Sequence, residues 1–183
     1  MSFPALLDTN VLYGGYLCDF FLRLAERRIY RPLWSEAILG ELSKNLLLRF
    51  ETAAVEHRLS SMRESFPDAL VAGYESLIPG MTCDDKDRHV LAAAIRGGAQ
   101  VLVTFNLDDF PPASLVSLDI EAVHPDQFLL DQLDLYPGQV TSALAAWSRD
   151  CQNPHLSAPE LLTFLVKSGV PQFATEAFRY LDS

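Results

Sequence analysis

The stretch Phe3-Pro4-Ala5-Leu6-Leu7-Asp8-Thr9-Asn10 decides how this chain can fold. An unbroken apolar run of this length, without polar alternation, is typical of a strand buried on both faces of a parallel sheet. The polar residues that follow end the strand and can begin a helix. Asp8 is therefore expected at the carboxyl edge of a sheet, where α/β proteins bind their ligands.

Strands and helices alternate over the rest of the first 125 residues. Apolar periodicity predicts helices over 11–28, 35–49, 52–65 and 85–95, with a short helical piece in 68–77. Further strands are predicted over 29–33, 101–104 and 118–123. Ser35 and Asp84 are the expected N-caps, and Gly97-Gly98 ends the fourth helix. This alternation predicts an α/β three-layer sandwich, in which helices flank a central, mostly parallel sheet.

The chain changes character after Pro125. Four helical segments separated by proline or glycine follow, over 126–135, 139–150, 158–167 and 171–181. We therefore divide the chain into an α/β domain, residues 1–125, and a helical C-terminal extension, residues 126–183. Residues 1–100 carry 11 basic and 13 acidic side chains, whereas 101–183 carry 3 and 11. The acidic extension is expected to pack on the first domain, to form a dimer, or to bind a basic partner.

Composition narrows the class of protein. A chain of 183 residues with 49% hydrophobic content can bury a core, and no apolar run is long enough to span a membrane. No leader is visible, and three scattered cysteines do not form a disulfide framework, so we expect a reduced, cytoplasmic protein. The net charge of −10 argues against sequence-independent binding of duplex nucleic acid. It does not exclude an enzyme that holds one phosphate through a metal ion.

Four acidic sites follow or begin predicted elements: Asp8, Glu41, Asp87 and the pair Asp108-Asp109. Each alone has an ordinary explanation, as a helix cap, a surface residue or a turn. Gathered together, such carboxylates repel by roughly 4 kcal/mol per pair at 4 Å and an effective dielectric near 20. A fold that collects them is expected to bind a divalent cation, and oxygen ligands suit Mg²⁺ or Mn²⁺.

The order of these segments resembles the PIN-domain ribonucleases, many of which are VapC-type toxins of bacterial toxin–antitoxin pairs. The resemblance spans residues 3–125 and is carried by four segments: Asp8-Thr9-Asn10-Val11-Leu12, Ser35 to Glu41-Leu42, Asp87-Arg88-His89-Val90 and Thr104-Phe105-Asn106-Leu107-Asp108-Asp109-Phe110. It implies that the catalytic and metal-binding acids are Asp8, Glu41, Asp87 and Asp109. It also implies a supporting role for Asn10, Thr104 and Asn106. Asp84 remains an alternative to Asp87, and Asp108 to Asp109.

The resemblance implies a metal-dependent endoribonuclease that uses Mg²⁺ or Mn²⁺. Its expected partners are an RNA substrate and possible further proteins, namely an antitoxin or a second copy in a homodimer, and no membrane. Lys86 or Arg88 could contact a phosphate, and a cluster of arginines (Arg23, Arg27, Arg28 and Arg31) could steer RNA or simply cover a helix end. Tyr13 and Trp34 could stack on a base or pack in the core. We assign no catalytic histidine, because His89 is expected to point away from Asp87.

Other classes remain open from the residues alone. A regulatory PIN-like module could use the acids to hold a structural cation without catalysis. A haloacid-dehalogenase-like phosphohydrolase would need a second carboxylate two residues after the first, where this chain has Asn10. A phospho-receiver domain would need a late lysine, and none lies between Lys86 and Lys167.

Overall fold

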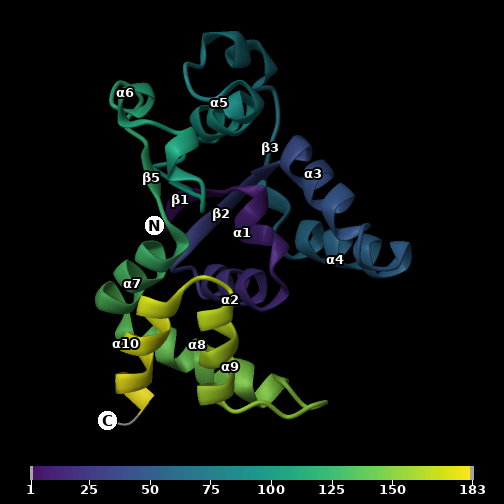
Figure 1. Cartoon of the computed structure of the whole chain (residues 1–183), viewed down its shortest axis with the longest axis vertical. Coiled ribbons are helices and arrows are strands. Elements are labelled where there is room, and N and C mark those ends of the chain that lie inside the picture. Colours follow the sequence, from purple (N-terminus) through teal and green to yellow (C-terminus); the bar gives the residue numbers. More distant parts are fainter. Residues whose placement is uncertain (1, 182–183) are drawn as a thin grey trace.

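A computed structural model describes residues 2–181 of the chain (Figure 1). Its centre is a five-stranded sheet in the order β3-β2-β1-β4-β5, in which every pair is parallel. The strands are β1 (Phe3–Leu7), β2 (Tyr30–Ser35), β3 (Leu70–Val71), β4 (Val101–Val103) and β5 (Glu121–Val123). The predicted α/β sandwich with a parallel sheet is confirmed.

Helices α1 to α6 lie between the strands along the chain, and helices α7 to α10 follow the last strand. The first part of the chain contains α1 (Thr9–Tyr13), α2 (Gly15–Glu26), α3 (Glu36–Leu46), α4 (Thr52–Ser65), α5 (Arg88–Gly97) and α6 (Pro112–Leu115). Short 3₁₀ turns lie at η1 (Pro67–Ala69), η2 (Glu75–Gly80), η3 (Asp85–Asp87) and η4 (Leu107–Asp109). The C-terminal part contains α7 (Pro125–Leu135), α8 (Pro137–Asp150), α9 (Ala158–Lys167) and α10 (Pro171–Leu181).

Helices cover both faces of the sheet. Figure 1 shows α5 on one side of the strands and α2 with α7 on the other. The central strand β1 is therefore enclosed, and Ala5, Leu6 and Leu7 are fully buried. This burial explains why the run that opens the chain is continuously apolar.

The strand order creates a crevice between β1 and β4, because the chain leaves these neighbouring strands in opposite directions along the sheet. Leu7 is paired with Val103, so Asp8 and Thr104 emerge side by side at the carboxyl edge. The backbone N–H of Asp8 continues the pairing by donating to the carbonyl of Val103 at 3.1 Å. Sheet register alone therefore brings together residues that are 96 positions apart in sequence.

Two local predictions were wrong, and one short helix was not predicted. The helix expected over 11–28 is broken at Gly14, whose extended backbone ends α1, and the Arg58 guanidinium donates to the carbonyl of Leu12 there at 2.5 Å. Within residues 68–77, where one helical piece was expected, Leu70–Val71 form the edge strand β3 between the 3₁₀ turns η1 and η2. The α6 helix after Pro111 was not predicted. All three depend on short segments in which tertiary contacts outweigh weak local preferences.

The helix predicted over 85–95 begins later than expected. Asp84 caps the short turn η3 by accepting from the backbone N–H of Lys86, and α5 starts only at Arg88. The predicted Ser35 cap is confirmed, since its hydroxyl accepts from Ile38 N–H at 3.2 Å. The predicted end at Gly98 is also confirmed, since this residue takes a left-handed conformation with φ of 65°.

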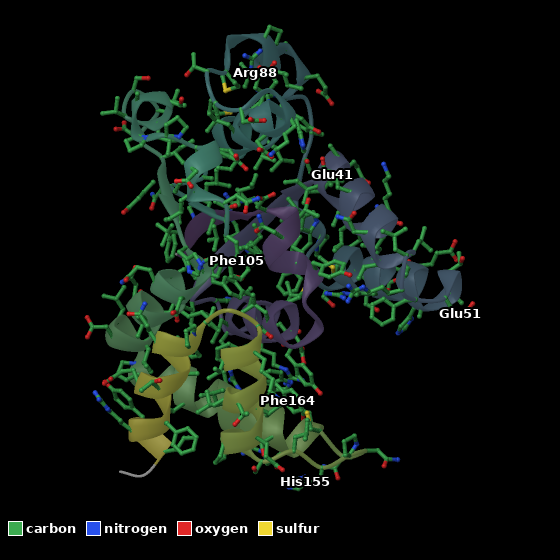
Figure 2. All side chains as sticks on the ribbon, in the orientation of Figure 1. Glu41, Glu51, Arg88, Phe105, His155 and Phe164 are labelled. Carbon is green, nitrogen blue, oxygen red and sulfur yellow. The ribbon has the colours of Figure 1, made fainter. Side chains whose placement is uncertain are left out.

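The C-terminal helices pack on α2 through aromatic side chains. Trp147 and Phe173 both contact Phe20, with ring centroids 5.5 Å apart in each pair. Tyr16 stacks on Phe164 of α9, which Figure 2 labels, at 4.3 Å. Arg23 of α2 adds a bond to Asp150 at the end of α8, at 2.6 Å. The expected packing of the extension on the first domain is thus seen in the structure.

None of the helices within residues 2–181 combines the length and the apolar character needed to cross a membrane. Cys18, Cys83 and Cys151 are unpaired, as expected for a chain without a disulfide framework.

Candidate active site

Asp8 is the most enclosed of the four predicted acids, with 6% of its surface exposed. Its Oδ1 accepts from Thr9 N–H at 2.7 Å, and its Oδ2 accepts from the Thr104 hydroxyl at 2.8 Å and from Asn10 Nδ2 at 2.9 Å. Burial raises the pKa of Asp8, while the hydrogen bonds from Thr104 and Thr9 oppose that rise and nearby Glu41 adds to it. The carboxylate is thus held in one orientation by three donors.

Asn10 and Thr104 tie the ends of β1 and β4 together. Asn10 Nδ2 donates to Thr104 Oγ1 at 3.1 Å, and Asn10 Oδ1 accepts from the backbone N–H of Phe105 at 3.2 Å. Thr104 Oγ1 also accepts from Asn106 N–H at 3.1 Å. The predicted supporting residues Asn10 and Thr104 therefore bond Asp8 directly, whereas Asn106 joins them through its backbone.

Glu41 reaches the site from α3 and is held at both oxygens. Its Oε2 accepts from the Thr9 hydroxyl at 2.9 Å, and its Oε1 lies 3.0 Å from His89 Nε2. The sequence predicted only that His89 points away from Asp87, and it did not predict the contact of this ring with Glu41 of α3. Sequence reasoning missed both Thr9 and His89, although each lies within two residues of a predicted acid.

Asp87 precedes α5, and Asp109 ends the η4 turn after β4. The ammonium of Lys86 lies 3.5 Å from Asp109 Oδ2 and 3.8 Å from Asp87 Oδ2. The Asp87 side chain is only 17% exposed, and its buried Oδ2 has no hydrogen-bond partner. Burial, followed by the charges of Asp8 and Asp109, raises the pKa of Asp87 to about 6. Burial and the neighbouring carboxylates therefore disfavour the charged form of Asp87.

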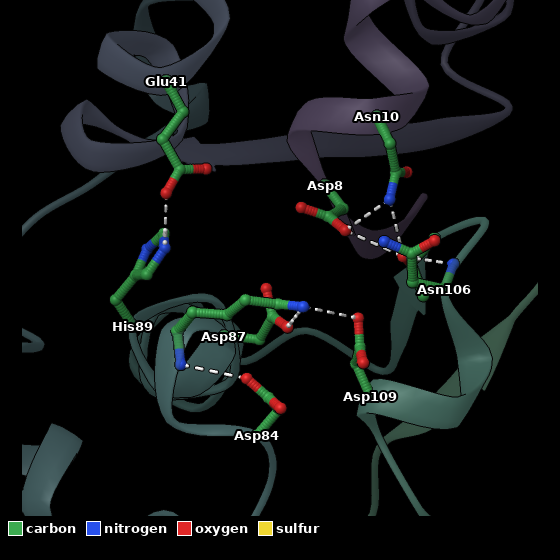
Figure 3. A network of polar contacts seen from close by, with 10 residues as sticks. Asp8, Asn10, Glu41, Asp84, Asp87, His89, Asn106 and Asp109 are labelled. Atoms are coloured by element: carbon green, nitrogen blue, oxygen red, sulfur yellow. Dashed lines mark hydrogen bonds and ion pairs between the residues drawn. The ribbon is translucent and has the colours of Figure 1, made fainter.

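The alternative acids lie in different surroundings. Asp84 is exposed and caps η3, accepting from Lys86 N–H at 3.2 Å. Asp108 is exposed, next to the half-buried Asp109. Arg88, proposed as a phosphate contact, binds Asp85 at 2.6 Å. Figure 3 shows Asp8 with Asn10 on one side of the site, and Asp84, Asp87 and Asp109 on the other.

A cleft of about 440 Å³ opens over these groups. Asp8, Glu41 and Asp87 line it together, with Asn10 and Asn106, so three of the four predicted acids share one cavity. Asp109 is not among the residues that line it and joins the group through Lys86. Lining the remaining wall are Thr9, Tyr13, Asn45, Leu48 and Arg49.

The aromatic and arginine side chains proposed to contact RNA lie in different surroundings. Tyr13 lines the cleft, whereas Trp34 is fully buried and packs edge-on against Phe66 at 6.0 Å. Arg23 and Arg27 bond Asp150 and the carbonyl of Ser142 in the C-terminal part. These two arginines therefore join the two parts of the chain.

The donor set fits a hard divalent cation in its chemistry. Carboxylates converge on one cavity, and one of them has a buried oxygen without a hydrogen bond and a raised pKa. Within residues 2–181, however, no three Asp, Glu, His or Cys side chains are already grouped tightly enough to hold a metal. Glu41 is engaged by His89, and Asp109 by Lys86, so a cation would have to compete with these two partners.

Comparison with known proteins defines the class. The family model "PIN domain" matches residues 4–108, more than half of the chain, and a second model, "VapC50 C-terminal domain", matches residues 125–179. This protein belongs to the PIN domain family, which confirms the resemblance drawn from its motifs.

One relative is similar over much of its length. A Mycobacterium tuberculosis (strain ATCC 25618 / H37Rv) protein named "Putative ribonuclease VapC50" is 45% identical over 115 residues, which is 63% of this chain and 68% of that protein. No solved structure matches the chain.

Proposed function

We propose that this protein is a metal-dependent endoribonuclease that hydrolyses RNA phosphodiester bonds and acts as the toxin of a toxin–antitoxin pair. The single observation that carries the proposal is the convergence of Asp8, Glu41 and Asp87 on one cleft of a PIN domain. The name of the similar mycobacterial protein, which calls it a ribonuclease, supports the same activity.

In this proposal Asp8, Glu41, Asp87 and Asp109 hold Mg²⁺ or Mn²⁺. A bound divalent ion supplies an acidified water molecule and neutralises charge on the phosphate. Asn10 and Thr104 keep the Asp8 carboxylate aimed into the cleft. Thr9 and His89 do the same for Glu41. Lys86, whose side chain is 68% exposed beside Asp87 and Asp109, would contact a phosphate group of the substrate.

The first experiment compares Asp8→Asn with the parent protein on a mixed RNA pool. Cleavage should fall by at least about 1,000-fold, because the variant loses a charge that no neighbour replaces. Asp85→Asn is the matched control, since Asp85 lies in the same acidic segment but is 87% exposed and paired with Arg88. An Asp8→Asn protein that cleaves like the parent would sink the assignment.

The two open assignments have their own test. Asp87→Asn and Asp109→Asn should each abolish cleavage and weaken Mn²⁺ binding measured by calorimetry. Asp84→Asn and Asp108→Asn should retain both, since these side chains are exposed, whereas Asp87 and Asp109 are half-buried and share the Lys86 ammonium. The reverse pattern would move the metal-binding roles to Asp84 and Asp108.

A regulatory module is the second candidate, favoured by the side chains that already engage two of the acids, His89 on Glu41 and Lys86 on Asp109. Such a module would bind Mn²⁺ at the same acids without cutting RNA.

The toxin role has a separate readout: induced expression should arrest growth of a host, and Asp8→Asn should relieve the arrest. An antitoxin would then be recovered as a neutralising partner encoded beside the gene.

A further inference from the structure

The C-terminal helices touch the loop that carries the candidate site. Gly169, in the turn between α9 and α10, has a φ of +93°, and a Cβ atom there would lie 2.9 Å from Cε1 and 3.3 Å from Cζ of Phe105. On the same ring, His124 makes an edge contact at a centroid distance of 5.0 Å and an interplanar angle of 87°. Phe105, labelled in Figure 2, is thus held between the end of β5 and the α9–α10 turn.

The backbone of Phe105 belongs to the Asp8 network. Its N–H donates to Asn10 Oδ1 at 3.2 Å, while Asn10 Nδ2 donates to Asp8 Oδ2 at 2.9 Å. A primary amide has one accepting end and one donating end. The Phe105 N–H therefore fixes the position of the accepting end of the Asn10 amide, which leaves the donating end for Asp8 and Thr104.

The α9–α10 turn has its own attachment to the sheet. Asp126, only 4% exposed and two residues beyond His124, accepts from the backbone N–H groups of Gln172 at 3.1 Å and Phe173 at 2.8 Å. These bonds fix the N-terminus of α10 close to the end of β5. Gly169 is consequently held against Phe105 by contacts that do not involve the candidate site.

We infer that the C-terminal helices form part of the site through Phe105, which acts as a positioning residue. Gly169 and His124 hold its ring, its N–H orients the Asn10 amide, and that amide orients the Asp8 carboxylate. The orientation follows from the structure alone. Its effect on cleavage rests on the proposed function.

The test is Gly169→Ala, whose new methyl group displaces the Phe105 ring. Hydrogen exchange at the Phe105 amide should accelerate by at least about tenfold, and kcat should fall about 10- to 100-fold with KM within about twofold. Gly98→Ala is the matched control, because Gly98 also has a positive φ (+65°) but nothing within 4 Å of the added atom. It should leave both the Phe105 exchange and kcat near the parent values.

A rescue separates the contact from backbone strain. Phe105→Leu removes both crowded atoms and is expected to fold even where Gly169→Ala does not. The double variant Phe105→Leu with Gly169→Ala should match Phe105→Leu alone within about twofold in exchange and in kcat. Equal losses from Gly169→Ala in both backgrounds would overturn the inference.

Three further outcomes are informative. Unchanged Phe105 exchange in Gly169→Ala, or faster exchange with an unchanged kcat, would also overturn the inference. Faster exchange in a protein whose parent form cleaves no RNA would instead contradict the proposed nuclease and uphold the positioning of Asn10 by Phe105.

Discussion

The carboxyl edge of the sheet and the C-terminal helices are built on opposite principles. At the edge, Asp8 and Asp87 are buried or nearly so, and their charges raise the energy of the folded state. In the C-terminal part, Trp147, Phe173 and Phe128 are buried against rings of the first part. We infer that the buried acids of the site lower the free energy of unfolding, and that aromatic packing in the C-terminal part offsets this loss. Substitutions in the two regions should therefore change stability in opposite directions.

The largest effect is expected from Trp147→Ala. Trp147 is 1% exposed, stacks on Phe20 at 5.5 Å and lies under the Arg23 guanidinium at 5.9 Å. Removing a buried ring of this size costs about 3–5 kcal/mol in the free energy of unfolding, measured by denaturant titration. Val166→Ala is the control, since Val166 is 45% exposed on α9 and should cost well under about 1 kcal/mol. If Trp147→Ala lowers the free energy of unfolding no more than Val166→Ala does, aromatic packing does not supply the stability assigned to it here.

The opposite sign is expected from Asp87→Asn in metal-free buffer. The pKa of Asp87 is raised from 3.8 to about 6, so the folded state binds its proton more tightly than the unfolded state does. Stability of the parent protein is therefore lost as pH rises from about 4 to 6, and the whole penalty is present above that. Asp87→Asn should raise the free energy of unfolding by about 1–3 kcal/mol at pH 7.5.

That gain should shrink as the pH is lowered from about 6 toward 4 and vanish only below the ordinary pKa of 3.8, where Asp87 is protonated in both the folded and the unfolded state. Asp85→Asn is the control, as Asp85 is 87% exposed. A destabilised Asp87→Asn protein at pH 7.5, or a gain that does not change with pH, would contradict the view that this carboxylate is strained.

A smaller loss is expected from Asp126→Ala. The Asp126 carboxylate accepts hydrogen bonds from two backbone N–H groups at the start of α10. Without this side chain, both N–H groups lose their hydrogen-bond acceptor. The cost should be about 1–2 kcal/mol by thermal or denaturant unfolding. Asp131→Ala on the same helix is the control, since Asp131 is exposed and bonds only Gln127 among the described side chains. Equal values for the two variants would show that Asp126 does not fix the C-terminal helices.

The smallest effect is expected at the surface between α3 and α4, outside both regions. Arg63 pairs with Glu36 at 2.8 Å, with side chains 41% and 59% exposed. Arg63→Ala should cost less than about 1 kcal/mol and fade in high salt. Denaturant unfolding of Arg63→Ala and the parent protein at about 0.05 and 1 M NaCl measures this loss. A loss of several kcal/mol would mean that exposed ion pairs stabilise the fold as much as the buried aromatic side chains do.

The proposed division at residue 125 remains a prediction, and the packing of α8–α10 on α2 bears on how it should be tested. Phe20 and Phe21 are fully buried, partly beneath Trp147, Phe173 and Phe128. A truncation within this region would expose those rings to water. Substitutions such as Trp147→Ala are therefore the better test of how far the two parts depend on each other.

The elements that could be predicted from the sequence are those whose signals lie within a few neighbouring residues. The apolar run before Asp8 specified a buried central strand, Ser35 specified a helix start, and the acids at strand ends indicated one carboxyl edge. Such signals are readable because burial on both faces and unsatisfied helix N–H groups restrict residue types over a few neighbouring positions.

Which distant side chains come into contact could not be predicted from the sequence and depends on the folded chain. His89 reaches Glu41 across 48 positions because the η3 turn sets the rotation of α5, and Gly169 meets Phe105 because Asp126 fixes the start of α10. These contacts depend on how whole helices are rotated and placed against the sheet. That placement is set by packing of the entire core, which leaves no mark in the few residues on either side of each contact.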